Sequence, residues 1–130
     1  MPRIVHIALK VEDLEKASRF YETVFGFRRV KEGPVRDHTS RHLTDGRLDL
    51  ALITYHSKES AEATAAGTGP CIHHIGIEVE DLEEYLKLLK RQGCELISPP
   101  GEVPIKFRDP SGIVAEIVPP GRYTSDAPAD

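Results

Sequence analysis

Two histidines and two carboxylates lie in short apolar segments of this sequence, where a polar side chain is costly to bury. His6 lies in IVHIALK and His74 in IHHIGIE, while Asp49 lies in RLDLALI and Glu116 in IVAEIV. A buried carboxylate is unfavourable unless it is paired or binds a cation. Imidazole and carboxylate groups together form a ligand set for Zn, Fe, Mn, Co or Ni. We therefore expect His6, Asp49, His74 and Glu116 to form one divalent metal site, with the identity of the metal left open.

The segments around the two histidines resemble one another. IVHIALKVEDLE, which begins at Ile4, and IHHIGIEVEDLE, which begins at Ile72, share eight of twelve residues without a gap. A shift of 68 residues superimposes His6 on His74. Such a match indicates an internal repeat. We therefore expect two similar modules that place their histidines at equivalent positions.

The first half predicts a βαβββ module. Residues 4–11 alternate polar and apolar side chains, as a half-buried strand does. Asp13 is a typical helix N-cap and Gly26 a typical helix stop, with apolar residues at helical spacing between them. Three further strands are predicted near 27–32, 38–44 and 47–55, with turns at Gly33-Pro34 and Asp45-Gly46.

The second half predicts the same order of elements. A strand over 72–79 precedes a helix that Asp81 caps and Gly93 ends. Further strands are predicted near 94–98, 103–108 and 113–118. We expect one domain over residues 1–118, made of module one (3–56), a linker (57–70) and module two (71–118), followed by a loosely ordered tail (119–130).

The alternation of each strand predicts where its side chains point. The apolar side of each opening strand must cover the helix that follows, so His6 and His74 face the opposite surface of the sheet. Glu116 and Asp49 fall on that same surface. His73 alternates with His74, so we expect it to face the helix layer as a packed or locally hydrogen-bonded residue.

Composition excludes several classes of protein. The chain has 130 residues, 29% of them charged and 39% hydrophobic, which is typical of one folded domain. A net charge of −4 without a basic block argues against nucleic acid as a partner. No apolar run reaches the length of a membrane span, and the first strand begins too early to follow a signal peptide. With Cys71 and Cys94 at no metal-like or redox-like spacing, we expect a cytoplasmic protein with two free thiols.

Three longer segments resemble the vicinal oxygen chelate superfamily of glyoxalases, methylmalonyl-CoA epimerases, bleomycin-resistance proteins and extradiol dioxygenases. They are HIALKVEDLEKASRFYETVFGF, HHIGIEVEDLEEYLKLLKRQGCELI and FRDPSGIVAEIV, and the resemblance extends over residues 4–118. It implies that His6, His74 and Glu116 are metal ligands. The remaining ligand of glyoxalases and epimerases is a Glu or Gln followed by an apolar residue, and Asp49 is its nearest match. Asp is one methylene shorter, so it would reach the metal directly, through water, or not at all.

The resemblance and the repeat together predict an α+β fold in which two tandem βαβββ modules form a curved, eight-stranded mixed sheet. The sheet would surround an open cup, with the helices outside. The cup would form within one chain or across two, and the edges and apolar surface of each module favour a homodimer.

The resemblance implies a metal-dependent lyase, or an isomerase or epimerase, acting on a small oxygen-chelating molecule. The metal would stabilise an enolate as a Lewis acid while Glu116 moves a proton. Two alternatives stay open. A site made only of His6, His74 and Glu116 would resemble that of the iron-dependent extradiol dioxygenases, which are usually longer chains. A metal-free protein that sequesters a drug-like molecule is the other.

Overall fold

The computed structural model describes residues 1–35 and 37–123. In the first half, the helix and the strands follow one another in the expected order. A short additional helix precedes the second half. In chain order the elements are β1 (Arg3–Lys10), α1 (Leu14–Phe25), β2 (Arg28–Val35), β3 (His38–Thr44), β4 (Asp49–Tyr55), α2 (Ala61–Thr64), β5 (Cys71–Glu78), α3 (Leu82–Arg91), β6 (Ile105–Arg108) and β7 (Val114–Val118).

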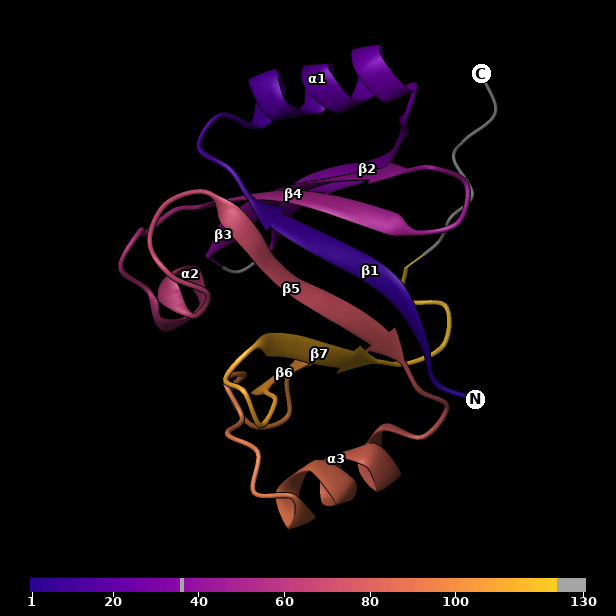
Figure 1. The fold of residues 1–130 in the computed structure, drawn as a ribbon, viewed down its shortest axis with the longest axis vertical. Coiled ribbons are helices and arrows are strands. Elements are labelled where there is room, and N and C mark those ends of the chain that lie inside the picture. Colours follow the sequence, from indigo (N-terminus) through magenta and orange to yellow (C-terminus); the bar gives the residue numbers. More distant parts are fainter. Residues whose placement is uncertain (36, 124–130) are drawn as a thin grey trace.

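All the named strands belong to one open, mixed sheet in the order β2-β3-β4-β1-β5-β7-β6 (Figure 1). The two strands that carry the histidines, β1 and β5, pair antiparallel at its centre. Each has a parallel neighbour from its own half, β4 beside β1 and β7 beside β5. The sheet therefore brings His6, His74, Asp49 and Glu116 onto four adjacent strands of a single chain.

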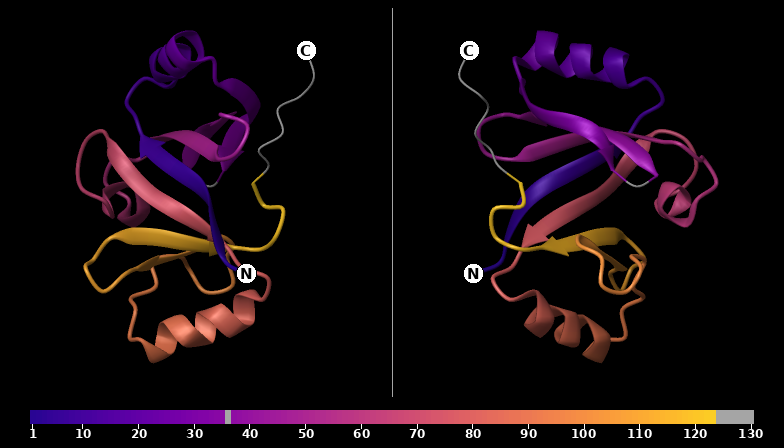
Figure 2. Two further views of the ribbon diagram at one scale, coloured as in Figure 1. Left: turned by 45° about the vertical axis from the view of Figure 1, so that its right-hand side comes forward. Right: turned by 180° about the vertical axis from the view of Figure 1, so that it is seen from behind.

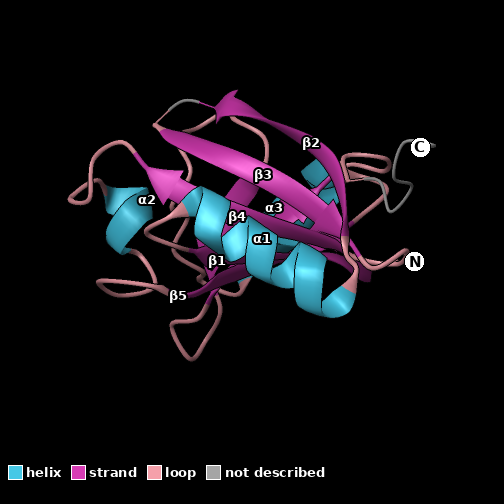
Figure 3. Ribbon diagram, turned by 90° about the horizontal axis from the view of Figure 1, so that it is seen from above, coloured by secondary structure: helices cyan, strands magenta, loops and turns pink. Residues whose placement is uncertain are grey.

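The two long helices cover opposite ends of the sheet. In Figures 1 and 2, α1 lies over the β2–β4 end and α3 beside β6 and β7. Figure 3 shows α1 lying across β3 and β4. The predicted caps are confirmed, since Asp13 accepts from the Lys16 amide and Asp81 from the Glu84 amide. No helix in the described part of the chain is long and apolar enough to span a membrane.

The sheet differs from the expected one in two places. Seven strands are present among the described residues instead of eight, because segment 94–98 forms only one bridge, between Leu96 and Phe107. The turn expected at Gly33-Pro34 is absent, and both residues lie within β2. The proline is tolerated there because β2 is an edge strand, where a missing N–H need not break the sheet.

The segments on either side of module two also carry structure. The expected linker contains α2. Ser60 caps the N-terminus of this helix, because its side chain accepts a hydrogen bond from the Ala63 amide. Residues 119–123 of the expected tail are described, and they carry Tyr123 back over the sheet. Residues 124–130 lie outside the described part of the chain.

The pairing of β1 with β5 contains two irregularities. The register passes from Ile4 directly to His6 on β1, and from His74 directly to Ile72 on β5, so that Val5 and His73 are extra residues. A β-bulge of this kind changes the direction in which the neighbouring side chains point. The expectation that His73 faces the helix layer is therefore wrong, because strict alternation fails at a bulge. His73 instead lies against the His74 ring.

A glycine allows the histidine strands to approach Glu116. Gly76 pairs with His6 on one side and with Glu116 on the other. A Cβ atom on Gly76 would lie 2.9 Å from the His6 Cβ and 3.2 Å from the Glu116 Oε2. Any side chain at this position would push these two residues away from each other.

Candidate metal centre

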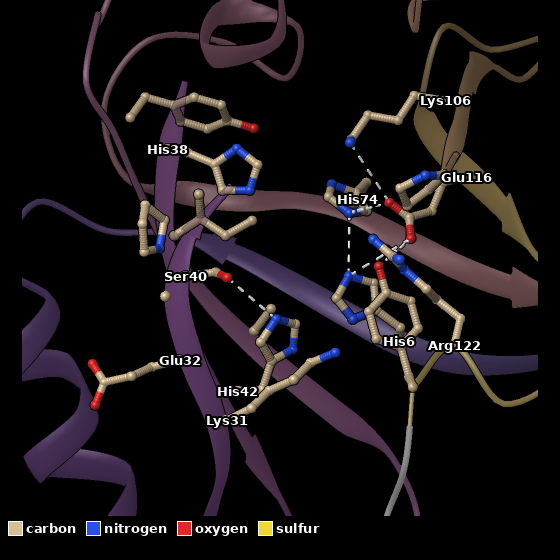
Figure 4. Close-up of a pocket in the computed structure, with 17 residues that line it drawn as sticks. His6, Lys31, Glu32, His38, Ser40, His42, His74, Lys106, Glu116 and Arg122 are labelled. Carbon is tan, nitrogen blue, oxygen red and sulfur yellow. Dashed lines mark hydrogen bonds and ion pairs between the residues drawn. The ribbon is translucent and has the colours of Figure 1, made fainter. Parts of the chain in front are cut away.

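A cavity of about 300 Å³ lies on the inner surface of the curved sheet. Figure 4 shows side chains from strands of both halves pointing into it, with His6, His74 and Glu116 close together. Lys106 and His42 approach the same region from β6 and β3. The candidate site is thus assembled by one chain from segments far apart in the sequence.

Three of the four expected ligands, His6, His74 and Glu116, bring their potential metal-binding atoms close together. The His6 Nε2 lies 3.2 Å from the His74 Nε2, which in turn lies 2.8 Å from the Glu116 Oε1. One donor atom from each residue lies within 4.8 Å of the others. All three side chains are buried, and among the described residues the His74 Nε2 is the one nitrogen within hydrogen-bond distance of the Glu116 Oε1.

These three residues fit a divalent cation. Two imidazole nitrogens and a carboxylate oxygen that meet in a buried place repel one another unless a proton or a cation lies between them, and a bound divalent ion would satisfy all three. Two imidazoles and one carboxylate also match the ligand types of first-row transition metals. Burial by itself raises the pKa of Glu116, but the contact with His74 and the nearby His6 and Lys106 outweigh it and lower that pKa. Glu116 is therefore ionised, as a ligand must be.

Asp49 lies at the site but on the other edge of the His6 ring. Its Oδ2 accepts from the His6 Nδ1 at 2.5 Å, and both carboxylate oxygens lie within 2.9 Å of the His42 Nδ1. Burial disfavours ionisation of Asp49, but the hydrogen bonds from His42 and His6 outweigh it and lower the pKa. Because a carboxylate oxygen can only accept, the His6 Nδ1 donates to Asp49, and the other ring nitrogen, Nε2, faces His74 and Glu116.

Tyr123 is a site residue that the strand pattern could not reveal, because it follows the last strand. Its hydroxyl donates to the Glu116 Oε2 at 2.6 Å, and its ring stacks on the His6 ring with centroids 3.9 Å apart. Burial, followed by the charge of Glu116, raises the pKa of Tyr123, so the phenol keeps its hydrogen. Tyr123 thus contacts two of the three clustered residues.

Lys106 and His73 complete the surroundings. The Lys106 Nζ is buried and lies 3.8 Å from the Glu116 Oε1 and 3.8 Å from the Glu62 Oε1. The His73 Nδ1 lies 2.8 Å from the His74 Nδ1. Burial, with a smaller contribution from His74, lowers the pKa of His73 to about 4, so its ring is neutral at neutral pH. The sequence pattern did not predict either contact, because Lys106 lies on a short strand and His73 lies at a β-bulge, where the alternation of side chains fails.

Relatives of the chain include a lyase and an epimerase. The chain is 26% identical to the lactoylglutathione lyase of Neisseria meningitidis, and the match covers 89% of each protein. It is 25% identical to the mitochondrial methylmalonyl-CoA epimerase of Bos taurus, over 88% of this chain and 73% of the relative. The match therefore extends over most of the chain.

Solved structures share the fold. The methylmalonyl-CoA epimerase of Mycobacterium tuberculosis superimposes with a TM-score of 0.75 at 22% identity, over 91% of this chain and 87% of the other. The sequence profile of the Glyoxalase/Bleomycin resistance protein/Dioxygenase superfamily matches residues 3–117, which include all four expected ligand positions. The chain therefore belongs to the Glyoxalase/Bleomycin resistance protein/Dioxygenase superfamily.

Proposed function

We propose that this protein is a metal-dependent lyase or isomerase that acts on a small molecule able to chelate the metal through two oxygens. The observation that carries the proposal is the meeting of the His6 Nε2, the His74 Nε2 and the Glu116 Oε1 in one buried cluster. Relatives that are a lyase and an epimerase support this class of reaction. The metal would be Zn, Ni, Co, Mn or Fe.

Each residue of the site would have a separate role. His6, His74 and Glu116 would hold the ion, and Asp49 would orient His6 from outside. A divalent metal bound there would act as a Lewis acid and favour the enolate form of a carbonyl substrate. Glu116 would move the proton, because it is the buried carboxylate that lines the cavity. Tyr123, at the Glu116 Oε2, and Lys106, beside its Oε1, favour that ionised form.

One observation favours a second candidate. The Asp49 carboxylate is held by His6 and His42 and lies outside the cluster of His6, His74 and Glu116. The remaining set of two histidines and one carboxylate is that of non-haem iron oxygenases. An iron-dependent ring-cleaving dioxygenase is therefore the alternative reaction for this site.

The assembly proposed for the protein is a homodimer of chains that each contain two tandem modules. The repeat-related residues Ile4 and Ile72 support it, because they lie on the adjacent central strands and are 54% and 71% exposed. Isolated exposed apolar residues are common, but a symmetric pair beside the repeat axis favours a contact between identical chains.

Loss of any clustered residue should remove the metal. We expect the His6→Ala, His74→Ala and Glu116→Ala variants to bind a divalent ion more than about 100-fold more weakly than the wild type. This loss is larger than the loss caused by removing a residue that only contacts a ligand. Metal content after equilibrium dialysis against Zn, Ni, Co, Mn or anaerobic Fe(II) measures this. The His56→Ala variant is the control, since His56 is exposed and lies outside the cavity lining. A wild-type protein that takes up none of the five ions would contradict the proposal and leave a metal-free binding protein.

The reaction class is tested by solvent exchange. A metal-loaded lyase or isomerase should incorporate deuterium from D₂O beside a substrate carbonyl, and methylmalonyl-CoA and S-lactoylglutathione are the first compounds to test by NMR. A protein that shows no exchange but consumes oxygen with Fe(II) and a catechol would be the dioxygenase instead.

Asp49 distinguishes a direct ligand from an outer-sphere one. Asp49 accepts from His6 and His42, so we expect it to act on the metal only through His6. The Asp49→Ala variant should then bind the metal about 10–100-fold more weakly, the range found for outer-sphere partners. Titration calorimetry with Zn on Asp49→Ala, compared with His74→Ala, gives the two losses side by side. An equal loss in both variants would show that Asp49 binds the metal itself.

The dimer is tested by replacing an exposed isoleucine. At micromolar concentration, light scattering should give twice the mass of one chain for the wild type. Ile72→Lys should give the mass of one chain, because an unpaired charge would be buried in the contact. A wild-type protein that is monomeric under these conditions would rule the dimer out.

A further inference from the structure

We propose that Lys106 is a specificity-determining residue that binds a carboxylate group of the substrate. Lys106 lines the same cavity as His6, His74 and Glu116, so this carboxylate would lie beside the proposed metal position. The substrate would then be a small organic acid with a second oxygen that faces the metal. The assignment rests on the proposed function, since it names the substrate class of that same site.

The fold holds Lys106 beside Glu116. The two residues are directly opposite one another in the antiparallel pair of β6 and β7, and cross-strand neighbours present their side chains on the same face of a sheet. The Lys106 amide also donates to the Ser98 Oγ at 2.8 Å, and its carbonyl accepts from the Ile97 amide at 2.8 Å. Figure 4 shows the ammonium of Lys106 pointing toward Glu116. The backbone therefore fixes the point from which this cation enters the cavity.

The Lys106 ammonium is buried but only loosely paired. Lys106 is 3% exposed, and its Nζ lies 3.8 Å from both the Glu62 Oε1 and the Glu116 Oε1. Within residues 1–35 and 37–123, Nζ makes these two ion pairs and no hydrogen bond. A charged N–H donor prefers an oxygen at about 2.7–2.9 Å, and an ammonium carries three such donors. An acceptor in the cavity would therefore complete its contacts.

The charges of the cavity favour an anionic acceptor over a neutral one. The charged side chains of its described lining, histidines aside, are Lys31, Lys106, Arg122, Glu32 and Glu116. Glu32 is already paired, since it accepts from the buried Arg41 at 3.0 Å. A metal ion held by Glu116 would add positive charge. A cleft lined by charges of one sign concentrates ligands of the opposite sign, so the cavity favours an anion.

The size of the cavity limits that anion. Its volume of about 300 Å³ lies at the lower end of the range of about 300–1,000 Å³ that is common for small-molecule pockets. The Glu116 Oε1 lies 2.8 Å from the His74 Nε2 and 3.8 Å from the Lys106 Nζ, so the metal position and the ammonium are close neighbours. A short acid can therefore offer its carboxylate to Lys106 and a nearby oxygen to the metal.

A comparison of malonate with malonamide, its uncharged diamide of similar shape, tests the role of Lys106. Chemical-shift titrations of the ¹⁵N-labelled, metal-free, full-length chain at pH 7.5 give the dissociation constant of each compound. The wild type should bind malonate about 10–100-fold more tightly than malonamide, as expected for hydrogen bonds to a charged group. Lys106→Met keeps most of the side-chain length without the charge. This variant should lose the preference, because its affinity for malonate alone falls.

Two further lysine variants serve as comparisons. Lys90→Met removes an exposed lysine outside the cavity lining and should keep the wild-type preference for malonate. Lys31→Met should weaken malonate binding less than Lys106→Met does, because Lys31 is exposed and solvent screens its charge. A larger loss in Lys31→Met than in Lys106→Met would contradict the role of Lys106.

The wild-type measurement decides the question even if Lys106→Met does not fold. A wild-type protein that binds malonate no more tightly than malonamide would overturn the assignment. An unchanged preference for malonate in a folded Lys106→Met protein would overturn it as well. Neither titration requires a bound metal, so a failure here is distinguishable from a failure of metal uptake in the dialysis experiment.

Discussion

The antiparallel pairing of β1 with β5 is the constraint on which the candidate site depends. It brings two histidines from opposite halves of the chain within 3.2 Å of one another. The parallel neighbours β4 and β7 then add one carboxylate on each side, Asp49 and Glu116. Gly76 keeps the space between His6 and Glu116 free. Without this pairing the four residues would lie on separate sheets, and no single buried cluster would form.

The two halves use different partners for equivalent histidines. His6 donates to a carboxylate, while His74 contacts a second imidazole that in turn contacts a backbone carbonyl. The charge of the site is therefore uneven, with Asp49 on one side and Lys106 on the other. An asymmetric site on a nearly symmetric sheet is suited to a substrate whose two ends differ, because each end meets a different set of groups.

Much of the fold and three of the clustered residues could be predicted from the sequence because they follow strict periodicities. His6, His74 and Glu116 were found from strand alternation and the 68-residue repeat, and both helix caps from their aspartates. His73 was misplaced because a bulge breaks the period of two without a sequence marker. Tyr123 was missed because its place depends on how the chain returns after β7. The eighth strand, expected at 94–98, does not form among the described residues. Pairing partners decide whether a short apolar run becomes a strand, and this segment makes only one bridge.

X-ray absorption at the Zn edge of the Zn-loaded wild-type protein tests the central claim, that the two halves share one metal, most directly. The outer-shell scattering of imidazole rings counts histidine ligands without relying on activity. The account predicts two imidazoles and only nitrogen or oxygen in the first shell, at about 2.0–2.2 Å. A spectrum with one imidazole or none, or with a sulfur ligand at about 2.3 Å from Cys71 or Cys94, would contradict it.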